Sequence, residues 1–142
     1  MICTFFGHRD VSEGIRDRLY LLICNLIEKD SIYEFVVGNN GSYDYIVQTV
    51  LKELKRAYPQ IKYSIVLSRL DEKALTENQE RTVYPSELAY SLPKFSISKR
   101  NDWLLKKASV VIVYVKKKYS NSYKLAERAK RRGSRVINIA DI

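Results

Sequence analysis

The amino-acid sequence predicts an α/β protein with a doubly wound, mainly parallel sheet of five strands and helices on both faces. Apolar runs of strand length alternate with segments whose apolar residues recur every three or four positions, a pattern typical of repeated β-α-β units. Polar turns that contain glycine follow the first two apolar runs. The chain has 142 residues, the length of one ordinary domain, so we expect a single domain over residues 1–142.

The predicted strands are short apolar runs bounded by polar turns. They cover residues 2–6, 32–37, 61–67, 110–115 and 135–139. Because β-α-β crossovers are right-handed, this order favours a sheet in which the first strand is central and the fourth lies beside it. The carboxyl ends of those two strands then form the switch point of the sheet, where ligands bind.

Two amphipathic helices are predicted between the first three strands. An apolar stripe over residues 15–27 follows Ser12, a residue type that caps helices. A second stripe covers residues 46–54, and Pro59 follows where a helix ends. Each stripe gives its helix one face to pack against the sheet.

Residues 69–98 interrupt this alternation, because they contain two prolines and several acidic residues without a sustained period. A long stretch of this kind inside a compact domain is typically either a functional lid or a sign of a missed secondary-structure element, and we expect a lid-like insertion with some short helix. A short helix over residues 103–108 then leads to the fourth strand. The last helix covers about residues 122–132 and ends at Gly133, a residue type that terminates helices.

The composition favours a cytoplasmic protein without a membrane anchor. Hydrophobic residues make up 46% and charged residues 29%, and no apolar stretch approaches the roughly 20 residues that cross a bilayer. The first six residues lack a basic leader and a cleavage site. Cys3 and Cys24 fall at apolar positions, where reduced thiols pack as small hydrophobes. His8 is the single histidine, and we expect neither a metal nor a cofactor.

The net charge of +9 is concentrated in the last third of the chain. Residues 1–98 carry 12 basic and 13 acidic side chains, whereas residues 116–135 carry nine basic side chains and one glutamate. Tyrosines at 114, 119 and 123 are interleaved with these charges. The segment fits either a solvated helix face or a surface for nucleic acid, whose affinity would fall steeply as salt rises.

Two polar turns predict an anion site, Gly7-His8-Arg9-Asp10 after the first strand and Gly38-Asn39-Asn40-Gly41-Ser42 after the second. Such turns at helix N-termini gather backbone N–H groups and short polar side chains around an anion. The glycines permit close approach of the backbone, and Arg9 supplies a planar, two-pronged donor. Asn39 and Asn40 are able to bind hydroxyl or amide groups. The combination suits phosphate, ribose and base.

These motifs also have structural interpretations. His8 fits a solvated loop residue or a hydrogen-bond partner of the backbone, so Arg9 is the stronger candidate. Asn40-Gly41 is a hairpin signal, but the helical spacing after it favours a strand, a turn and a helix. Lys99, Arg100 and Asp102 fit either a solvated helix start with an ion pair or positions that face a ligand.

Four motifs spread over almost the whole chain carry a family resemblance. They are Phe6-Gly7-His8-Arg9, the segment from Val37 to Asp44, Tyr58-Pro59, and Lys99-Arg100-Asn101-Asp102-Trp103. In this order they resemble the SLOG superfamily, and the chain looks most like its small bacterial and phage members of unknown function. The resemblance implies a Rossmann-like fold that binds nucleotides or nucleotide-derived ligands. It adds Asp44, Arg100 and Asn101 to the ligand-binding candidates.

Relatives in this superfamily include enzymes that cleave the N-glycosidic bond of cytokinin ribotides, and sensors of nucleotide signals in anti-phage systems. The enzymes carry a glycine-rich phosphate loop with a threonine and a glutamate, where this chain has residues 119–124. Ser120 and Ser122 are still able to cap the helix and contact an anion, and Lys124 to neutralise it. The catalytic glutamate has no counterpart, because Glu127 lies one turn further on among basic residues. The loop therefore favours binding over catalysis.

Three hypotheses follow. The first is binding of a nucleotide-derived small molecule for signal sensing or sequestration in phage–bacteria conflict, with residues 69–98 closing over it and Tyr84 or Tyr90 stacking on a base. The second is a hydrolase or transferase acting on an N-ribosidic bond, with Asp44 or Asp10 as the carboxylate. The third is nucleic-acid binding by the basic segment. The eleven tyrosines favour an interface between copies of the chain, so we expect a homo-oligomer.

Overall fold

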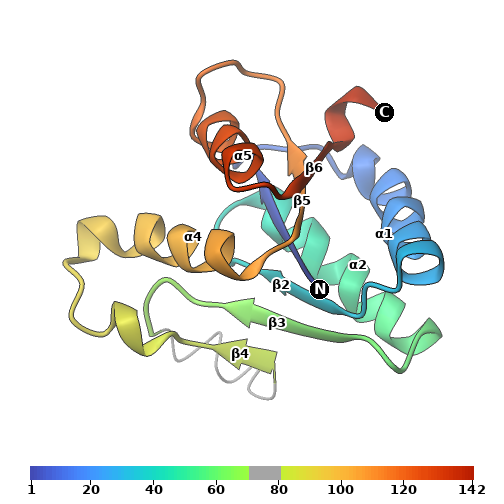
Figure 1. Cartoon of the computed structure of the whole chain (residues 1–142), viewed down its shortest axis with the longest axis horizontal. Coiled ribbons are helices and arrows are strands. Elements are labelled where there is room, and N and C mark those ends of the chain that lie inside the picture. The colour runs from blue at the N-terminus through green and yellow to red at the C-terminus, as the bar shows by residue number, and fades with distance from the viewer. Residues whose placement is uncertain (71–80) are drawn as a thin grey trace.

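The computed structural model describes residues 1–70 and 81–142 and has three layers, with a six-stranded sheet between two pairs of helices (Figure 1). The strand order is β4-β3-β2-β1-β5-β6, and all neighbours are parallel. The strands are β1 (Ile2–Gly7), β2 (Glu34–Val37), β3 (Lys62–Val66), β4 (Thr82–Val83), β5 (Val110–Tyr114) and β6 (Arg135–Asn138). The helices are α1 (Arg16–Asp30), α2 (Ser42–Ala57), α4 (Ser96–Lys107) and α5 (Asn121–Arg131).

The predicted fold class is confirmed, and so is the central position of the first strand. Strand β1 pairs with β2 on one side and with β5 on the other. Residues 38–42 form the predicted turn between a strand and a helix, so the hairpin interpretation of Asn40-Gly41 is wrong. The sheet therefore has its switch point between β1 and β5, as the chain order predicts.

Two element predictions need correction. The sheet has six strands instead of five, because β4 pairs with β3 at the edge; two residues are too short to give a strand pattern in the sequence. Helix α4 begins at Ser96, seven residues before the predicted 103. Its first two turns are mostly polar, so the apolar period becomes visible only near its end.

The predicted lid-like insertion over residues 69–98 is described only in part, because residues 71–80 lie outside the described residues. The part that the structure describes contains β4, two 3-10 turns (Ser86–Leu88 and Pro93–Phe95) and the start of α4. Within residues 1–70 and 81–142, no helix has the length and apolar character needed to cross a membrane.

Both faces of the sheet are buried, which explains why the strands are continuous apolar runs. In β5, Val110, Ile112 and Tyr114 belong to the core cluster under α1 and α2, whereas Val111 and Val113 belong to the cluster under α4 and α5. The side chains thus alternate between the two faces along the strand. This packing fixes the carboxyl ends of β1 and β5, and hence the loops that follow them.

Tyr43 ties α2 to the centre of the sheet, because its fully buried hydroxyl donates a hydrogen bond to the Ile112 carbonyl at 3.0 Å. Tyr43→Phe keeps the ring and removes this bond, and we expect it to lower the free energy of unfolding by about 1–2 kcal/mol. Urea denaturation measures the change. Tyr45→Phe is the matched control, since Tyr45 lies on the same helix and is 61% exposed. Equal effects of the two substitutions would contradict the prediction.

Candidate functional site

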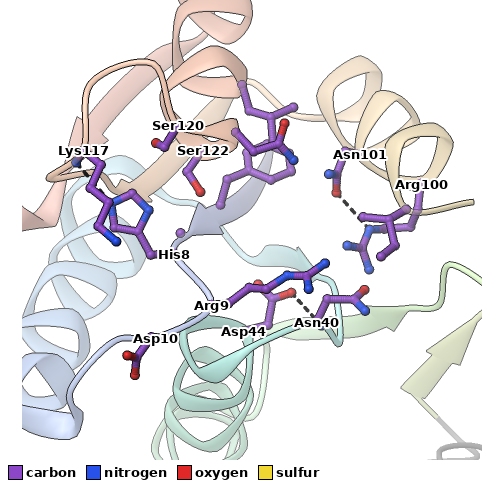
Figure 2. Close-up of a pocket in the computed structure, with 15 residues that line it drawn as sticks. His8, Arg9, Asp10, Asn40, Asp44, Arg100, Asn101, Lys117, Ser120 and Ser122 are labelled. Atoms are coloured by element: carbon purple, nitrogen blue, oxygen red, sulfur yellow. Dashed lines mark hydrogen bonds between the residues drawn. The ribbon is translucent and has the colours of Figure 1, made fainter. Parts of the chain in front are cut away.

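A pocket of about 410 Å³ lies at the carboxyl ends of β1 and β5, the predicted switch point (Figure 2). Its walls come from the loop after β1, the start of α2, one face of α4 and the start of α5. Ten of the fifteen candidate residues line it: Gly7, His8, Arg9, Asp10, Asn40, Asp44, Arg100, Asn101, Ser120 and Ser122. The structure therefore brings together side chains from four separate parts of the chain.

Five candidates lie outside the lining: Gly38, Asn39, Gly41, Ser42 and Lys124. The first four contact Arg9 or Arg100 and so shape the walls of the pocket. Lys124 is exposed on the outer side of α5. The proposed stacking residues Tyr84 and Tyr90 do not line the pocket either, since Tyr84 packs against the core and Tyr90 is 98% exposed.

Arg100 is a buried cation in the wall, with only 3% of its surface exposed. Its Nε donates to Asn101 Oδ1 at 3.0 Å, and its Nη1 donates to the Val66 carbonyl at 3.2 Å and to Asn39 Oδ1 at 3.5 Å. A Cβ on Gly38 would lie 2.4 Å from Nη1, so the glycine makes room for the guanidinium. The alternative of a solvated helix start is therefore wrong for Arg100.

Asp102 behaves differently from its neighbour Arg100. Its carboxylate accepts a hydrogen bond from Arg128 at 2.6 Å, and both side chains are more than two-fifths exposed. Asp102 is thus solvated and ion-paired, as the structural interpretation expects, but its partner is Arg128 on α5 and not a basic residue of the helix start. Such an exposed pair stabilises the fold by less than about 1 kcal/mol.

Arg9 is a cation of the pocket wall whose guanidinium has no partner among the described residues. Its side chain is exposed and extends toward the same part of the cavity as the guanidinium of Arg100 (Figure 2). The guanidinium group forms no hydrogen bond or ion pair with any residue in 1–70 or 81–142. Because a guanidinium stays charged and offers five N–H donors, Arg9 is available to an anionic ligand.

The turn over residues 38–42 fixes the position of the Arg9 backbone. The Ser42 hydroxyl donates to the Arg9 carbonyl at 2.8 Å and accepts from Val11 N–H at 2.6 Å, while Ser42 N–H donates to the same carbonyl at 2.9 Å. Gly41 has a φ of +96°, a region that favours glycine, and a Cβ there would lie 2.8 Å from Arg9 Cα. Gly41 and Ser42 thus join the two turns and lie outside the pocket lining.

His8 also has a structural partner. Its Nε2 accepts hydrogen bonds from the backbone N–H groups of Lys116 and Lys117, at 3.0 and 3.3 Å. Burial and then the charge of Lys117 lower the pKa of His8, so the neutral ring that accepts these bonds is favoured. His8 therefore bridges the loops after β1 and β5 while its side chain lines the pocket.

Asp44 contributes a buried carboxyl group at the base of the pocket, 7% exposed, in the first turn of α2. Burial raises its pKa from 3.8 to about 6, against the opposing effects of Arg100 and of the Asn40 N–H, which donates to Oδ2 at 3.0 Å. The Asn40 side-chain oxygen is itself buried without a hydrogen-bond partner among the described residues. An acceptor is thus left free beside the two arginines.

The start of α5 forms the opposite side of the pocket. The Ser120 hydroxyl caps the helix by accepting from Tyr123 N–H at 3.2 Å, which confirms Ser120 as a capping residue. The N–H groups of Asn121 and Ser122 belong to the first turn, where no carbonyl of the helix is available to them. With the helix dipole, they favour a negative charge at this end of the cavity.

Five lining residues were not among the sequence candidates: Phe6, Ile97, Lys117, Asn121 and Leu125. Lys117 and Asn121 belong to the loop that the switch-point argument selects, so their place in the sequence was a usable signal. Ile97 lies three residues before Arg100, on the same face of a helix whose start the sequence does not reveal. Neither a family model nor a curated protein matches the chain.

Proposed function

We propose that this protein binds a nucleotide or a nucleotide-derived small molecule in the pocket between β1 and β5. The observation that carries the proposal is the convergence of Arg9, Arg100 and the start of α5 on one cavity at the switch point of a parallel sheet. The volume of about 410 Å³ lies in the range of small-molecule sites. The resemblance to the SLOG superfamily supports the same class of ligand.

Each part of such a ligand has matching chemistry in the pocket. The N–H groups at the start of α5 and the Arg9 guanidinium suit phosphate oxygens. The unpaired Asn40 oxygen suits a sugar hydroxyl or an exocyclic amine. Phe6, Ile97 and Leu125 offer apolar surface to a base. Because no carboxylate follows Ser122 in the first turn of α5, the role we propose is sensing or sequestration of a nucleotide signal.

Arg9→Ala tests this proposal. We expect it to weaken nucleotide binding at least about tenfold, because a charge-assisted hydrogen bond is lost while the fold is untouched. Thermal-shift screening against nucleoside monophosphates, cyclic nucleotides and cyclic dinucleotides identifies the ligand, and calorimetry gives the affinities. At a hundred times its dissociation constant, a ligand stabilises the protein by about 2.7 kcal/mol.

Arg56→Ala is the matched control for Arg9→Ala, because Arg56 is an exposed arginine near the end of α2, outside the pocket lining. It should bind the ligand like the wild type. If both variants bind equally well, or if no nucleotide shifts the unfolding temperature of the wild type, the proposal is wrong.

Asp44 favours a second candidate function, cleavage of an N-ribosidic bond. It is a carboxyl group in the pocket wall whose pKa of about 6 suits a general acid or base near neutral pH. The test is release of free base from nucleoside monophosphates under single-turnover conditions, with loss of release in Asp44→Asn. Absence of release by the wild type would exclude this activity for those substrates.

A further inference from the structure

The two helical layers of the molecule differ strongly in charge. Helices α4 and α5, which cover one face of the sheet (Figure 1), carry eight basic and two acidic residues. Helices α1 and α2, on the other face, carry six basic and five acidic residues. Most of the positive excess of the protein therefore lies on the α4–α5 face and on the loop that precedes α5.

Most of these charges are not neutralised by neighbours. Three basic residues of the segment pair with carboxylates: Arg128 with Asp102, Lys130 with Glu127, and Arg135 with Asp30. Six others are exposed and form no ion pair with any described residue: Lys116, Lys117, Lys118, Lys124, Arg131 and Arg132. Along α5, positions 124, 128 and 131 fall on one helix face, so Lys124 and Arg131 form a row with the paired Arg128 between them.

An anionic membrane is a poor match for this face. A helix that lies on a membrane inserts its apolar side between the lipids. The apolar side of α5 is not available to lipid, because Leu125, Ala126 and Ala129 are buried against the sheet. A row of charges on a helix without a free apolar side is instead the electrostatic pattern of a surface that follows a phosphate backbone.

Tyr119 adds an aromatic side chain at the end of this row. It is 69% exposed, and its backbone has a φ of +66°, a conformation that residues other than glycine rarely adopt. Its ring packs edge-on against Tyr123, with centroids 5.5 Å apart, and Lys118 Nζ lies 5.2 Å from its centroid. An exposed ring among lysines is suited to stack on an unpaired base.

We propose that the α4–α5 face binds a single-stranded nucleic acid, with phosphates along the row on α5 and a base stacked on Tyr119. This function is separate from ligand binding in the pocket. Bases in a single strand expose the faces that Tyr119 needs, whereas those in a duplex are stacked on one another.

Fluorescence anisotropy with labelled oligo(dT) and oligo(U), each about 20 nucleotides long, tests the proposal. If four phosphates are contacted, the slope of log affinity against log salt is about −3, so affinity falls about 50-fold between 50 and 200 mM salt. Absence of binding at 50 mM salt would overturn the proposal. So would binding to vesicles of equal phosphatidylcholine and phosphatidylserine without binding to either oligonucleotide.

A charge-reversal pair locates the surface. Lys124→Glu with Arg131→Glu should weaken binding at least about tenfold, because two phosphate contacts become repulsive. Lys52→Glu with Arg56→Glu is the matched control: both residues are exposed on α2, the net charge changes equally, and each pair has one member in the last turn of its helix. Equal losses in the two double variants would show a general charge effect and overturn the assigned surface.

Tyr119→Asn tests the stacking part, since asparagine tolerates the left-handed backbone conformation that this position requires. We expect at least about fivefold weaker binding to oligo(dT) with an unchanged salt slope, and no change for a duplex of the same length. Tighter wild-type binding to the duplex than to the single strand, with no effect of Tyr119→Asn, would overturn the preference for single strands.

Discussion

Gly38→Ala is expected to lower the free energy of unfolding by about 3 kcal/mol and to weaken nucleotide binding at least about tenfold. The added Cβ would lie 2.4 Å from Nη1, 2.6 Å from Cζ and 2.9 Å from Nη2 of Arg100. The guanidinium is buried and bonded to Val66, Asn39 and Asn101, so it cannot move without breaking these bonds. Urea denaturation and calorimetry measure the two effects.

A double-mutant cycle separates this clash from the general cost of a methyl group. In the Arg100→Ala background the guanidinium is absent, and Gly38→Ala should then cost less than about 1 kcal/mol. Gly14→Ala is the control, because a Cβ there would meet only Ser12 Oγ, at 3.5 Å. If Gly38→Ala lowers the free energy of unfolding by the same amount in both backgrounds, position 38 requires glycine for its backbone conformation and not to make room for Arg100.

The position of Arg100 shows where sequence reasoning reached its limit. The order of strands and turns predicted the switch point and its loops, because parallel strands and right-handed crossovers leave few arrangements. The Arg100 side chain can be buried only because Gly38, in a turn far away in the sequence, has no side chain. The polar pattern of Lys99–Asp102 gives no sign of this space. The space beside Gly38 that the guanidinium of Arg100 fills exists only in the three-dimensional structure.

Lys124 is the opposite case, a candidate residue in the segment that lines the pocket whose own side chain lies outside the lining. The pocket is lined by the first residues of α5 and by Leu125, whereas Lys124 is exposed and outside it. Successive residues of a helix are about 100° apart, so neighbours in sequence need not share a face. Without the exact start of α5, the sequence could not distinguish these two positions.

Asp44→Asn is expected to raise the free energy of unfolding at pH 7.5. Burial raises the pKa of Asp44 from 3.8 to about 6, more than Arg100 and the Asn40 N–H lower it. At about 1.4 kcal/mol per pKa unit, the ionised carboxylate costs the folded protein about 3 kcal/mol. Asparagine keeps the size of the side chain and an oxygen acceptor for the Asn40 N–H, and it carries no charge.

The pH dependence provides the measurement. Because the folded protein holds the Asp44 proton more tightly than the unfolded chain, the contribution of Asp44 to wild-type stability falls as pH rises from about 4 to about 6. The advantage of Asp44→Asn should therefore be only about 0.5 kcal/mol at pH 4 and reach about 3 kcal/mol above pH 7. Asp17→Asn is the control, since Asp17 lies exposed in the first turn of α1. A difference between Asp44→Asn and wild type that is constant with pH would contradict the assignment.

The same variant distinguishes the two candidate functions of the pocket. Protonation of Asp44 leaves Arg9 and Arg100 without an opposing carboxylate, so affinity for an anionic ligand should rise as pH falls through 6. A cyclic nucleotide is the suitable probe, because its phosphodiester does not titrate in this range. If the protein only binds, Asp44→Asn should bind this probe at least as tightly as the wild type at pH 7.5, with little dependence on pH. If Asp44 is the acid or base of N-ribosidic cleavage, the variant should bind nucleoside monophosphates but release no base.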